Sequence, residues 1–288
     1  MALSCIHTHT LFCDGAGDVE TFCRAAYEKG LGALGFSAHA PIEKKTSFSS
    51  SWNMPEERLN EYLDTVRAAK KRWEGKLPVY LGLEVDFIDR LMGPADRDYR
   101  KMDLDFIIGS VHYLIPPRGE PFTVDDDTEY VDRGIGEGFG GDSMAMVDMY
   151  YNSMAEMIRA GGFDLLGHPD LVRKNNANYR LFQEDNDFYR NKTASITALM
   201  AGTGVPGEVN TGGLNRGKMK DCYPSPPFLK LFREHDVPMV INADAHKADD
   251  LDGHYEEGRK AMLAAGYTET ALFEGRKNGS PQWKSEKL

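Results

Sequence analysis

Short apolar runs alternate with longer amphipathic segments along the whole chain. The apolar runs are short enough for buried strands, and the segments between them carry apolar residues at helical spacing. Repeated strands and helices of this kind are typical of a parallel sheet covered by helices. We therefore predict a seven-stranded α/β barrel over residues 1–288 as a single domain. The first predicted strand ends at His7, and the other six span 34–39, 79–85, 106–112, 163–168, 205–210 and 238–243. Helices are predicted at 19–29, from about Pro55, and at 146–160.

Three segments stand apart from this repeat. Residues 116–142 are acidic and rich in glycine, and they are too long for an ordinary connection, so we predict an inserted loop or lid. Residues 276–288 are mostly polar and are predicted as a surface extension. Asn53 precedes Glu56 by three residues, which predicts a capping box at the start of the second helix.

The charge balance restricts the class of partner. The chain has 45 acidic and 34 basic side chains and a formal net charge of −11, which disfavours binding to nucleic acid. Bound cations would neutralise part of this charge. The four cysteines form no C-x-x-C pair, and the chain has neither an N-terminal signal pattern nor a membrane-spanning apolar run. These features predict a reduced, cytoplasmic protein that does not bind membranes; the sequence does not indicate its oligomeric state.

Potential metal ligands stand at the ends of six of the seven predicted strands. Because the carboxyl ends of parallel strands meet on one face of a barrel, these side chains are expected to share one pocket. The alternative is a set of separately buried polar groups, which is disfavoured because buried ionisable groups are rare unless paired or coordinated. The candidate ligands are His7, His9, His39, Glu84, His112, His168, Asp244 and His246.

Several nearby residues allow two interpretations. Asp14 could add an oxygen ligand, or it could be a turn residue beside Gly15. Cys5 could share the face of His7, but a buried structural thiol is favoured. The remaining nitrogen and oxygen ligands suit zinc, manganese or iron equally.

Two arginines are placed to bind an anion. Arg173 follows the fifth predicted strand, and Arg216 follows the sixth. A guanidinium on either loop could bind a phosphate with two hydrogen bonds, although each residue could equally be a solvated surface arginine. Taken with the predicted metal ligands, phosphate binding is the favoured role.

In their order along the chain, these motifs resemble the polymerase and histidinol phosphatase (PHP) superfamily, and within it the PHP-type histidinol-phosphate phosphatases. The resemblance rests on motifs that span nearly the whole chain: His7-Thr8-His9, His39, Glu84, Ser110-Val111-His112, Gly167-His168-Pro169-Asp170 and Asp244-Ala245-His246. It implies a distorted, TIM-barrel-like seven-stranded barrel that holds three metal ions. This chain departs from the commoner pattern in its glycine-rich acidic insertion.

The resemblance also implies which residues share each ion. One ion would take His7, His9, Glu84 and Asp244, and a second would share Glu84 and take His112 and His168. A third would take Asp14, His39 and His246, and many relatives have a histidine where this chain has Asp14. We therefore expect two to three divalent ions of zinc, manganese or iron.

The predicted function is hydrolysis of a phosphomonoester, with L-histidinol phosphate as the expected substrate and histidine biosynthesis as the pathway. The mechanism that we expect is in-line attack on phosphorus by a water that bridges two metals and is deprotonated near neutral pH. Glu84, Asp244 and His246 are the predicted catalytic residues. The cationic end of the substrate is expected to meet Glu43 and Glu208, although Glu208 could equally be a buried structural carboxylate. Two alternatives are a phosphodiesterase or exonuclease of the same superfamily, and a non-catalytic module that only binds metal or phosphate.

Overall fold

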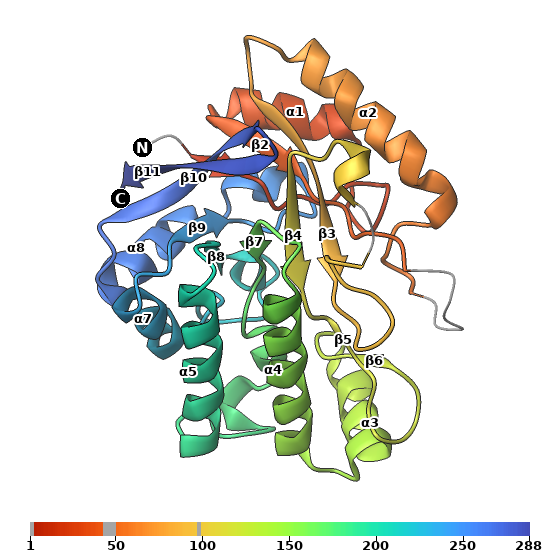
Figure 1. The fold of residues 1–288 in the computed structure, drawn as a ribbon, viewed down its shortest axis with the longest axis vertical. Coiled ribbons are helices and arrows are strands. Elements are labelled where there is room, and N and C mark those ends of the chain that lie inside the picture. Colours follow the sequence, from red (N-terminus) through yellow and green to blue (C-terminus); the bar gives the residue numbers. More distant parts are fainter. Residues whose placement is uncertain (1–2, 43–49, 97–98) are drawn as a thin grey trace.

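The computed structural model describes residues 3–42, 50–96 and 99–288. Seven parallel strands form one sheet with the order β1-β2-β3-β4-β7-β8-β9. The two edges approach each other where Thr8 pairs with Ala245, and His9 N donates to Ala245 O at 2.9 Å. The sheet therefore curls into a nearly closed barrel, which confirms the predicted fold (Figure 1). The strands are β1 Ser4–Cys5, β2 Ala33–Phe36, β3 Val79–Asp86, β4 Phe106–Ser110, β7 Leu165–Leu166, β8 Gly207–Asn210 and β9 Met239–Asn242.

Helices surround the barrel. They are α1 Val19–Glu28, α2 Leu59–Arg72, α3 Thr128–Phe139, α4 Ser143–Ala160, α5 Asp187–Ala201, the short α6 Gly212–Asn215, α7 Pro226–Glu234 and α8 Tyr255–Ala265. The connection from β3 to β4 differs from the predicted repeat, because its described part holds only the 3-10 turn Tyr99–Met102. In the part of the chain that the structure describes, no helix is both long and apolar enough to cross a bilayer.

The predicted inserted loop over 116–142 is largely regular structure. β5 Tyr113–Leu114, just before the segment, pairs with β6 Phe122–Thr123 inside it, and most of the residues after β6 form α3. Asp127 caps the N-terminus of α3 by accepting from Tyr130 N at 2.8 Å. Val131 and Ile135 lie one turn apart and are buried, so packing stabilises the helix despite its glycines. The segment is therefore an added hairpin and helix rather than an irregular loop.

The predicted polar extension also has regular structure. β10 Glu269–Lys277 and β11 Ser280–Lys287 form an antiparallel hairpin. Ala271 and Phe273 of β10 pack with Ile6, Phe106 and other side chains inside the barrel. Arg276 ties the hairpin to the barrel through Asp105 O at 3.0 Å and through the carboxylate of Asp164. The hairpin therefore covers the end of the barrel at which the strands begin (Figure 1).

The predicted capping box at Asn53 is wrong. The first turn, Glu56–Arg58, follows Pro55 and has no side-chain cap. The amide of Asn53 is instead buried and donates to Ala40 O at 2.8 Å and to Asp86 Oδ2 at 3.0 Å. Its oxygen accepts from the hydroxyl of Tyr113 at 2.7 Å. Asn53 therefore links the segment before α2 to the ends of β3 and β4.

Candidate metal centre

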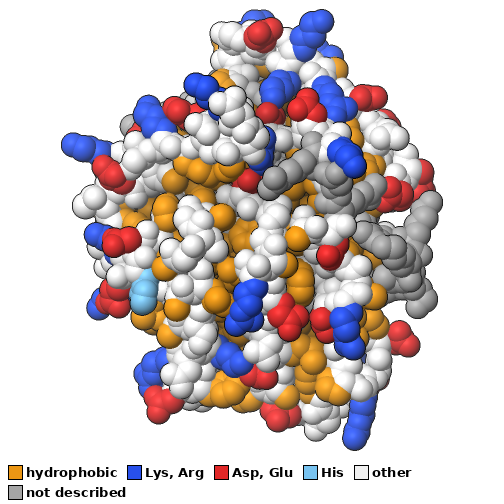
Figure 2. Space-filling view, in the orientation of Figure 1, with side chains coloured by type: hydrophobic (Ala, Val, Ile, Leu, Met, Phe, Trp, Pro, Cys, Tyr) orange, Lys and Arg blue, Asp and Glu red, His pale blue; other side chains and the backbone are white. Residues whose placement is uncertain are grey.

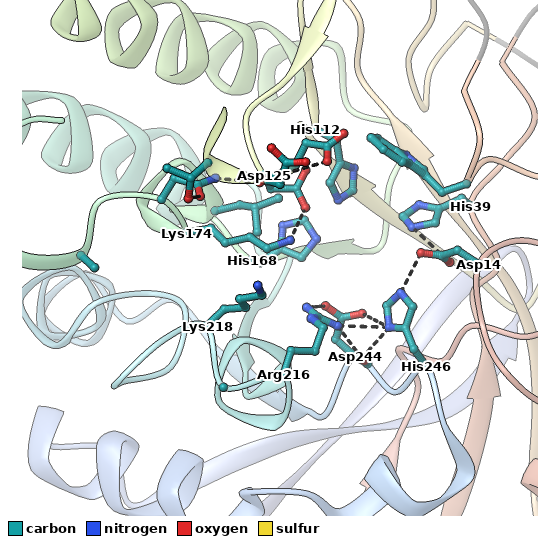
Figure 3. Close-up of a pocket in the computed structure, with 18 of the residues that line it drawn as sticks. Asp14, His39, His112, Asp125, His168, Lys174, Arg216, Lys218, Asp244 and His246 are labelled. Carbon is teal, nitrogen blue, oxygen red and sulfur yellow. Dashed lines mark hydrogen bonds and ion pairs between the residues drawn. The ribbon is translucent and has the colours of Figure 1, made fainter. Parts of the chain in front are cut away.

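The predicted ligand residues converge at the carboxyl ends of the strands. A cavity of about 730 Å³ opens there, and seven of the nine candidate ligands line it. The other two, His7 and His9, are fully buried next to it. Figure 3 shows the side chains of His39, His112, His168, Asp244 and His246 directed into the same space, together with Asp14. The structure thus brings together residues that lie far apart in the sequence.

In this cluster, His7 Nε2 and His9 Nε2 each lie close to the same two carboxylate oxygens. His7 Nε2 lies 3.2 Å from Glu84 Oε2 and 3.6 Å from Asp244 Oδ1. His9 Nε2 lies 3.4 Å from the same Glu84 oxygen and 3.3 Å from the same Asp244 oxygen. A zinc ion about 2.1 Å from each of four tetrahedral ligands would hold those ligands roughly 3.4 Å apart. These four distances are therefore close to the ligand–ligand separations around a single zinc ion.

The two carboxylate oxygens of Glu84 face different groups of ligands. Oε2 faces His7 and His9 and lies 3.1 Å from His39 Nδ1. Oε1 lies 3.0 Å from His168 Nε2 and 3.7 Å from His112 Nε2, and it accepts a hydrogen bond from Ser110 Oγ at 2.6 Å. Glu84 is therefore placed to bridge two cations.

A further group of ligands lies nearer the solvent. Asp14 Oδ2 is 3.0 Å from His246 Nε2, and Asp14 Oδ1 is 3.8 Å from His39 Nε2. Potential ligand atoms of these three residues and of His9 all lie within 4.8 Å of one another. Asp14 thus belongs to the cluster instead of serving only as a turn residue.

The donor chemistry fits divalent cations. Several buried donor atoms have no hydrogen-bond partner among the described residues: His7 Nε2, His9 Nε2, His39 Nδ1, Glu84 Oε2 and His168 Nδ1. A buried polar atom without a partner is costly, and coordination to a cation would remove that cost. The nitrogen and oxygen donors suit zinc, manganese or iron.

Close contact between buried imidazoles and carboxylates shifts the pKa values of this site. Burial by itself lowers the pKa of His7, but the charges of Glu208, Glu84 and Asp244 raise it well above the usual range. Burial raises the pKa of Glu84, yet His7, His39 and His112 hold it well below normal. Burial, with repulsion from His246 and His39, lowers the pKa of His9 to about 3. A field that favours a proton on His7 also favours a metal cation in its place.

Buried carboxylates orient two of the histidines. Glu208 Oε1 lies 2.7 Å from His7 Nδ1, and Glu208 Oε2 accepts from His168 N at 3.0 Å. Asp86 Oδ1 lies 2.6 Å from His112 Nδ1. Carboxylates in such positions fix the orientation of a metal-binding imidazole. Our sequence reasoning missed Asp86, although it lies two residues after Glu84 on the same strand and so on the same face.

The structure tests one of the two residues predicted to bind the cationic end of the substrate. Glu208 is fully buried and does not line the cavity. Its oxygens also accept from the amides of Asn210 at 2.9 Å and Asn242 at 3.0 Å, so its role is structural. The prediction that Glu208 meets substrate is therefore wrong. Glu43 lies outside the described residues.

The two predicted phosphate-binding arginines also differ. Arg216 lines the cavity, and its guanidinium lies 3.0 Å from Asp244 Oδ2 and 3.1 Å from His246 Nδ1. Arg173 does not line it. The guanidinium of Arg173 is buried against Glu184 at 2.7 Å, Asp221 at 3.2 Å and Asp170 at 3.5 Å. These carboxylates occupy its donors, so the geometry does not support a phosphate-binding role for Arg173.

Other cavity residues were missed by sequence reasoning. They include Trp52, Asp125, Asp126, Lys174 and Lys218. Asp125 pairs with Lys174 at 2.9 Å. Burial raises the pKa of Asp125, but Lys174 and His112 outweigh it and lower the pKa to about 2. These residues lie on long connections, and no spacing rule places such segments against the strand ends.

Comparison with known proteins supports the fold and identifies the family. Residues 6–211 match the model of the PHP domain. A curated relative from Deinococcus radiodurans, named Probable histidinol-phosphatase, is 29% identical over 275 residues, which cover 94% of this chain and 96% of the relative. The family match thus begins just after β1 and spans the barrel strands from β2 to the end of β8.

Two solved structures share the fold. A Listeria monocytogenes protein, provisionally named histidinol phosphatase, superimposes with a TM-score of 0.78 at 23% identity, over 88% of this chain and 98% of that one. The histidinol phosphate phosphatase of Lactococcus lactis was solved in complex with zinc, L-histidinol and phosphate. It superimposes with a TM-score of 0.63 at 18% identity, over 96% of this chain and 99% of that one. Because the family model matches well over half of the sequence, this chain belongs to the PHP domain family.

Proposed function

We propose that this protein is a metal-dependent phosphomonoester hydrolase and that L-histidinol phosphate is its substrate. The observation that carries the proposal is the approach of His7 Nε2 and His9 Nε2 to the same oxygens of Glu84 and Asp244, at the base of a pocket that also contains Arg216. The name of the Deinococcus radiodurans relative and the ligands of the Lactococcus lactis structure support the choice of substrate.

The residues of the cluster would hold two to three divalent ions of zinc, manganese or iron. In the proposed assignment, one ion would be held by His7, His9, Glu84 and Asp244, a second by Glu84, His112 and His168, and a third by Asp14, His39 and His246. When bound, such ions lower the pKa of water to about 7 and offset negative charge on phosphoryl oxygens.

Side chains of this protein would supply the remaining steps. Arg216 faces the pocket and can donate to a phosphoryl oxygen, which stabilises the charge that develops during phosphoryl transfer. Asp244 lies between the metal-ligand cluster and Arg216, where its carboxylate can accept the proton of the attacking water. His246 lies beside both residues and is the second candidate for this proton transfer.

The acidic wall of the pocket suits the cationic end of histidinol phosphate. Asp125, Asp126 and Asp127 line the pocket and belong to the added hairpin and helix. Asp125 is already paired with Lys174, whereas the carboxylate of Asp126 accepts a hydrogen bond from the backbone of Asp127 and makes no ion pair with any described residue. An ammonium or imidazolium group would therefore find its negative partners on this side, in place of Glu208.

A substrate panel tests the proposal. The protein, reconstituted separately with zinc, manganese and iron, is assayed for phosphate release from L-histidinol phosphate, a simple aryl monoester and an aryl diester, and for degradation of single-stranded DNA. We expect the highest kcat/KM for L-histidinol phosphate and little activity on the diester or DNA. Figure 2 shows positive and negative side chains interspersed over one face, which offers no basic surface there for nucleic acid.

Two other outcomes would contradict the proposal. Faster turnover of DNA or diester than of any monoester would identify a phosphodiesterase or exonuclease. A metal-loaded protein that is inert toward every phosphoester would indicate a binding module without catalysis.

A further inference from the structure

We propose that Lys218 is a second phosphate-binding residue of this pocket and that, with Arg216, it favours dianionic phosphomonoesters over diesters. The inference rests on the proposed function and deepens it by assigning the residues that select the class of phosphoester. Lys218 lines the cavity, two positions after Arg216 in the sequence.

The first argument is that Lys218 differs from the other cations of the cavity. Lys174 pairs with Asp125 at 2.9 Å, Arg180 with Asp132 at 2.7 Å, and Arg216 with Asp244 at 3.0 Å. The ammonium of Lys218 makes neither a hydrogen bond nor an ion pair with any described residue. It therefore has all three donors available for an anion that enters the pocket.

The second argument is that the backbone beneath Lys218 is fixed. Lys218 N and Met219 N both donate to Gly213 O, at 2.9 and 3.0 Å, and Gly217 N donates to Leu214 O at 2.9 Å. Gly217 has a φ of +62°, a left-handed conformation that reverses the chain after α6 and that glycine adopts without strain. Only the side chain of Lys218 would lose freedom on binding, which limits the entropic cost.

The third argument is the direction of the side chain. In Figure 3, Lys218 extends alongside Arg216 with its nitrogen turned toward the interior of the pocket. A phosphate that reaches Arg216 next to the metal-ligand cluster would therefore lie beside Lys218. This is the second donor that we had predicted Arg173 to provide; the donors of Arg173 are occupied by Glu184, Asp221 and Asp170.

The charge of the ligand explains the expected selectivity. A phosphomonoester carries close to two negative charges at neutral pH because its second pKa is about 6, whereas a diester carries one. The attraction of an added cation grows with the charge of its partner. Lys218 should therefore contribute more to the binding of a monoester or inorganic phosphate than to that of a diester.

The test compares Lys218→Met with Lys218→Arg and with Lys220→Met, all in metal-loaded full-length protein. Lys220 is an exposed lysine that does not line the cavity, so its variant is a matched control. Lys218→Met should raise KM for the monoester and the inhibition constant of inorganic phosphate by about tenfold, as expected for one lost charged hydrogen bond. The increase in KM that Lys218→Met causes for a diester should be clearly smaller. Lys218→Arg should restore most of the lost affinity, and Lys220→Met should behave as wild type.

Unchanged KM and phosphate inhibition in Lys218→Met, or equal losses for monoester and diester, would overturn the inference. Calorimetric titration with inorganic phosphate separates this result from failure of the proposed function. If the wild-type protein hydrolyses no phosphoester but binds phosphate, and Lys218→Met weakens that binding, the assignment of Lys218 stands while the enzymatic function fails. If metal-loaded wild type does not bind phosphate, both fail.

Discussion

Replacing Glu84 by Gln is expected to lower kcat for phosphate release by about 10³-fold, the upper end of the loss from removing one electrostatic group of an active site. Its two oxygens face separate groups of histidines, so loss of the charge weakens two sets of ligands at once. Glutamine keeps the size of the side chain but has one oxygen and no charge. Elemental analysis should show less bound metal per chain, in parallel with the loss of activity.

The control for this variant is Glu156→Gln, at an exposed position on α4. It should retain both metal and activity. Circular dichroism distinguishes a lost site from a lost fold in Glu84→Gln. If Glu84→Gln is folded and keeps wild-type metal content and turnover, Glu84 does not bridge the cations and the assignment of the ligand sets is wrong.

Replacing Phe106 by Ala should lower the free energy of unfolding by about 3–5 kcal/mol. Phe106 is fully buried inside the barrel, and its ring lies where a Cβ on Gly35 or Gly82 would be placed, at 2.9 and 2.5 Å. The ring also packs against Phe273 of the covering hairpin at a centroid distance of 5.4 Å. Gly35 and Gly82 have no side chains that could fill the space left by the lost ring, so a cavity should remain in Phe106→Ala.

Urea denaturation followed by fluorescence measures this loss. Phe188→Ala is the matched control, because Phe188 is 41% exposed on α5 and its removal should change stability by less than about 0.5 kcal/mol. If Phe106→Ala does not fold, Phe106→Leu provides a second measurement, because it should lower the free energy of unfolding by a smaller amount. Equal stability of Phe106→Ala and Phe188→Ala would show that this packing does not hold the barrel together.

The sequence predicted the barrel and the convergence of ligands because both depend on local patterns. Each strand is an apolar run that stops at a polar residue, and parallel strands place those stops on one face. His7 and His246 could therefore be assigned to one site from opposite ends of the chain. Asp86 follows the same rule two residues after Glu84, so it was accessible from sequence although it was not identified.

The errors arose where distant segments decide the role of a residue. Arg173 is held by Glu184, which lies later in the same connection, and by Asp221, which lies in the connection after β8; sequence spacing does not reveal such partners. Glu208 is on a strand whose described side chains are all buried, so the sequence did not distinguish the cavity from the interior.

Composition did not reveal the regular structure within the two added segments. Glycines at 134, 136 and 138 argue against a helix, but Gly134 and Gly138 leave room for Phe122 and Pro116 against α3. The chain from 276 to 288 is polar because β11 is largely exposed; β10 contributes Ala271 and Phe273 to the barrel interior, and Trp283 of β11 packs against them. In each case a tertiary contact, rather than local preference, decided the structure.

The central claim is that His7, His9, Glu84 and Asp244 surround a cation. Diffraction from crystals of zinc-reconstituted protein, recorded on both sides of the zinc absorption edge, locates bound zinc directly. The account predicts an anomalous peak within about 2.3 Å of donor atoms of these four residues. Zinc found only elsewhere on the molecule, or no peak in protein that elemental analysis shows to contain zinc, would contradict it.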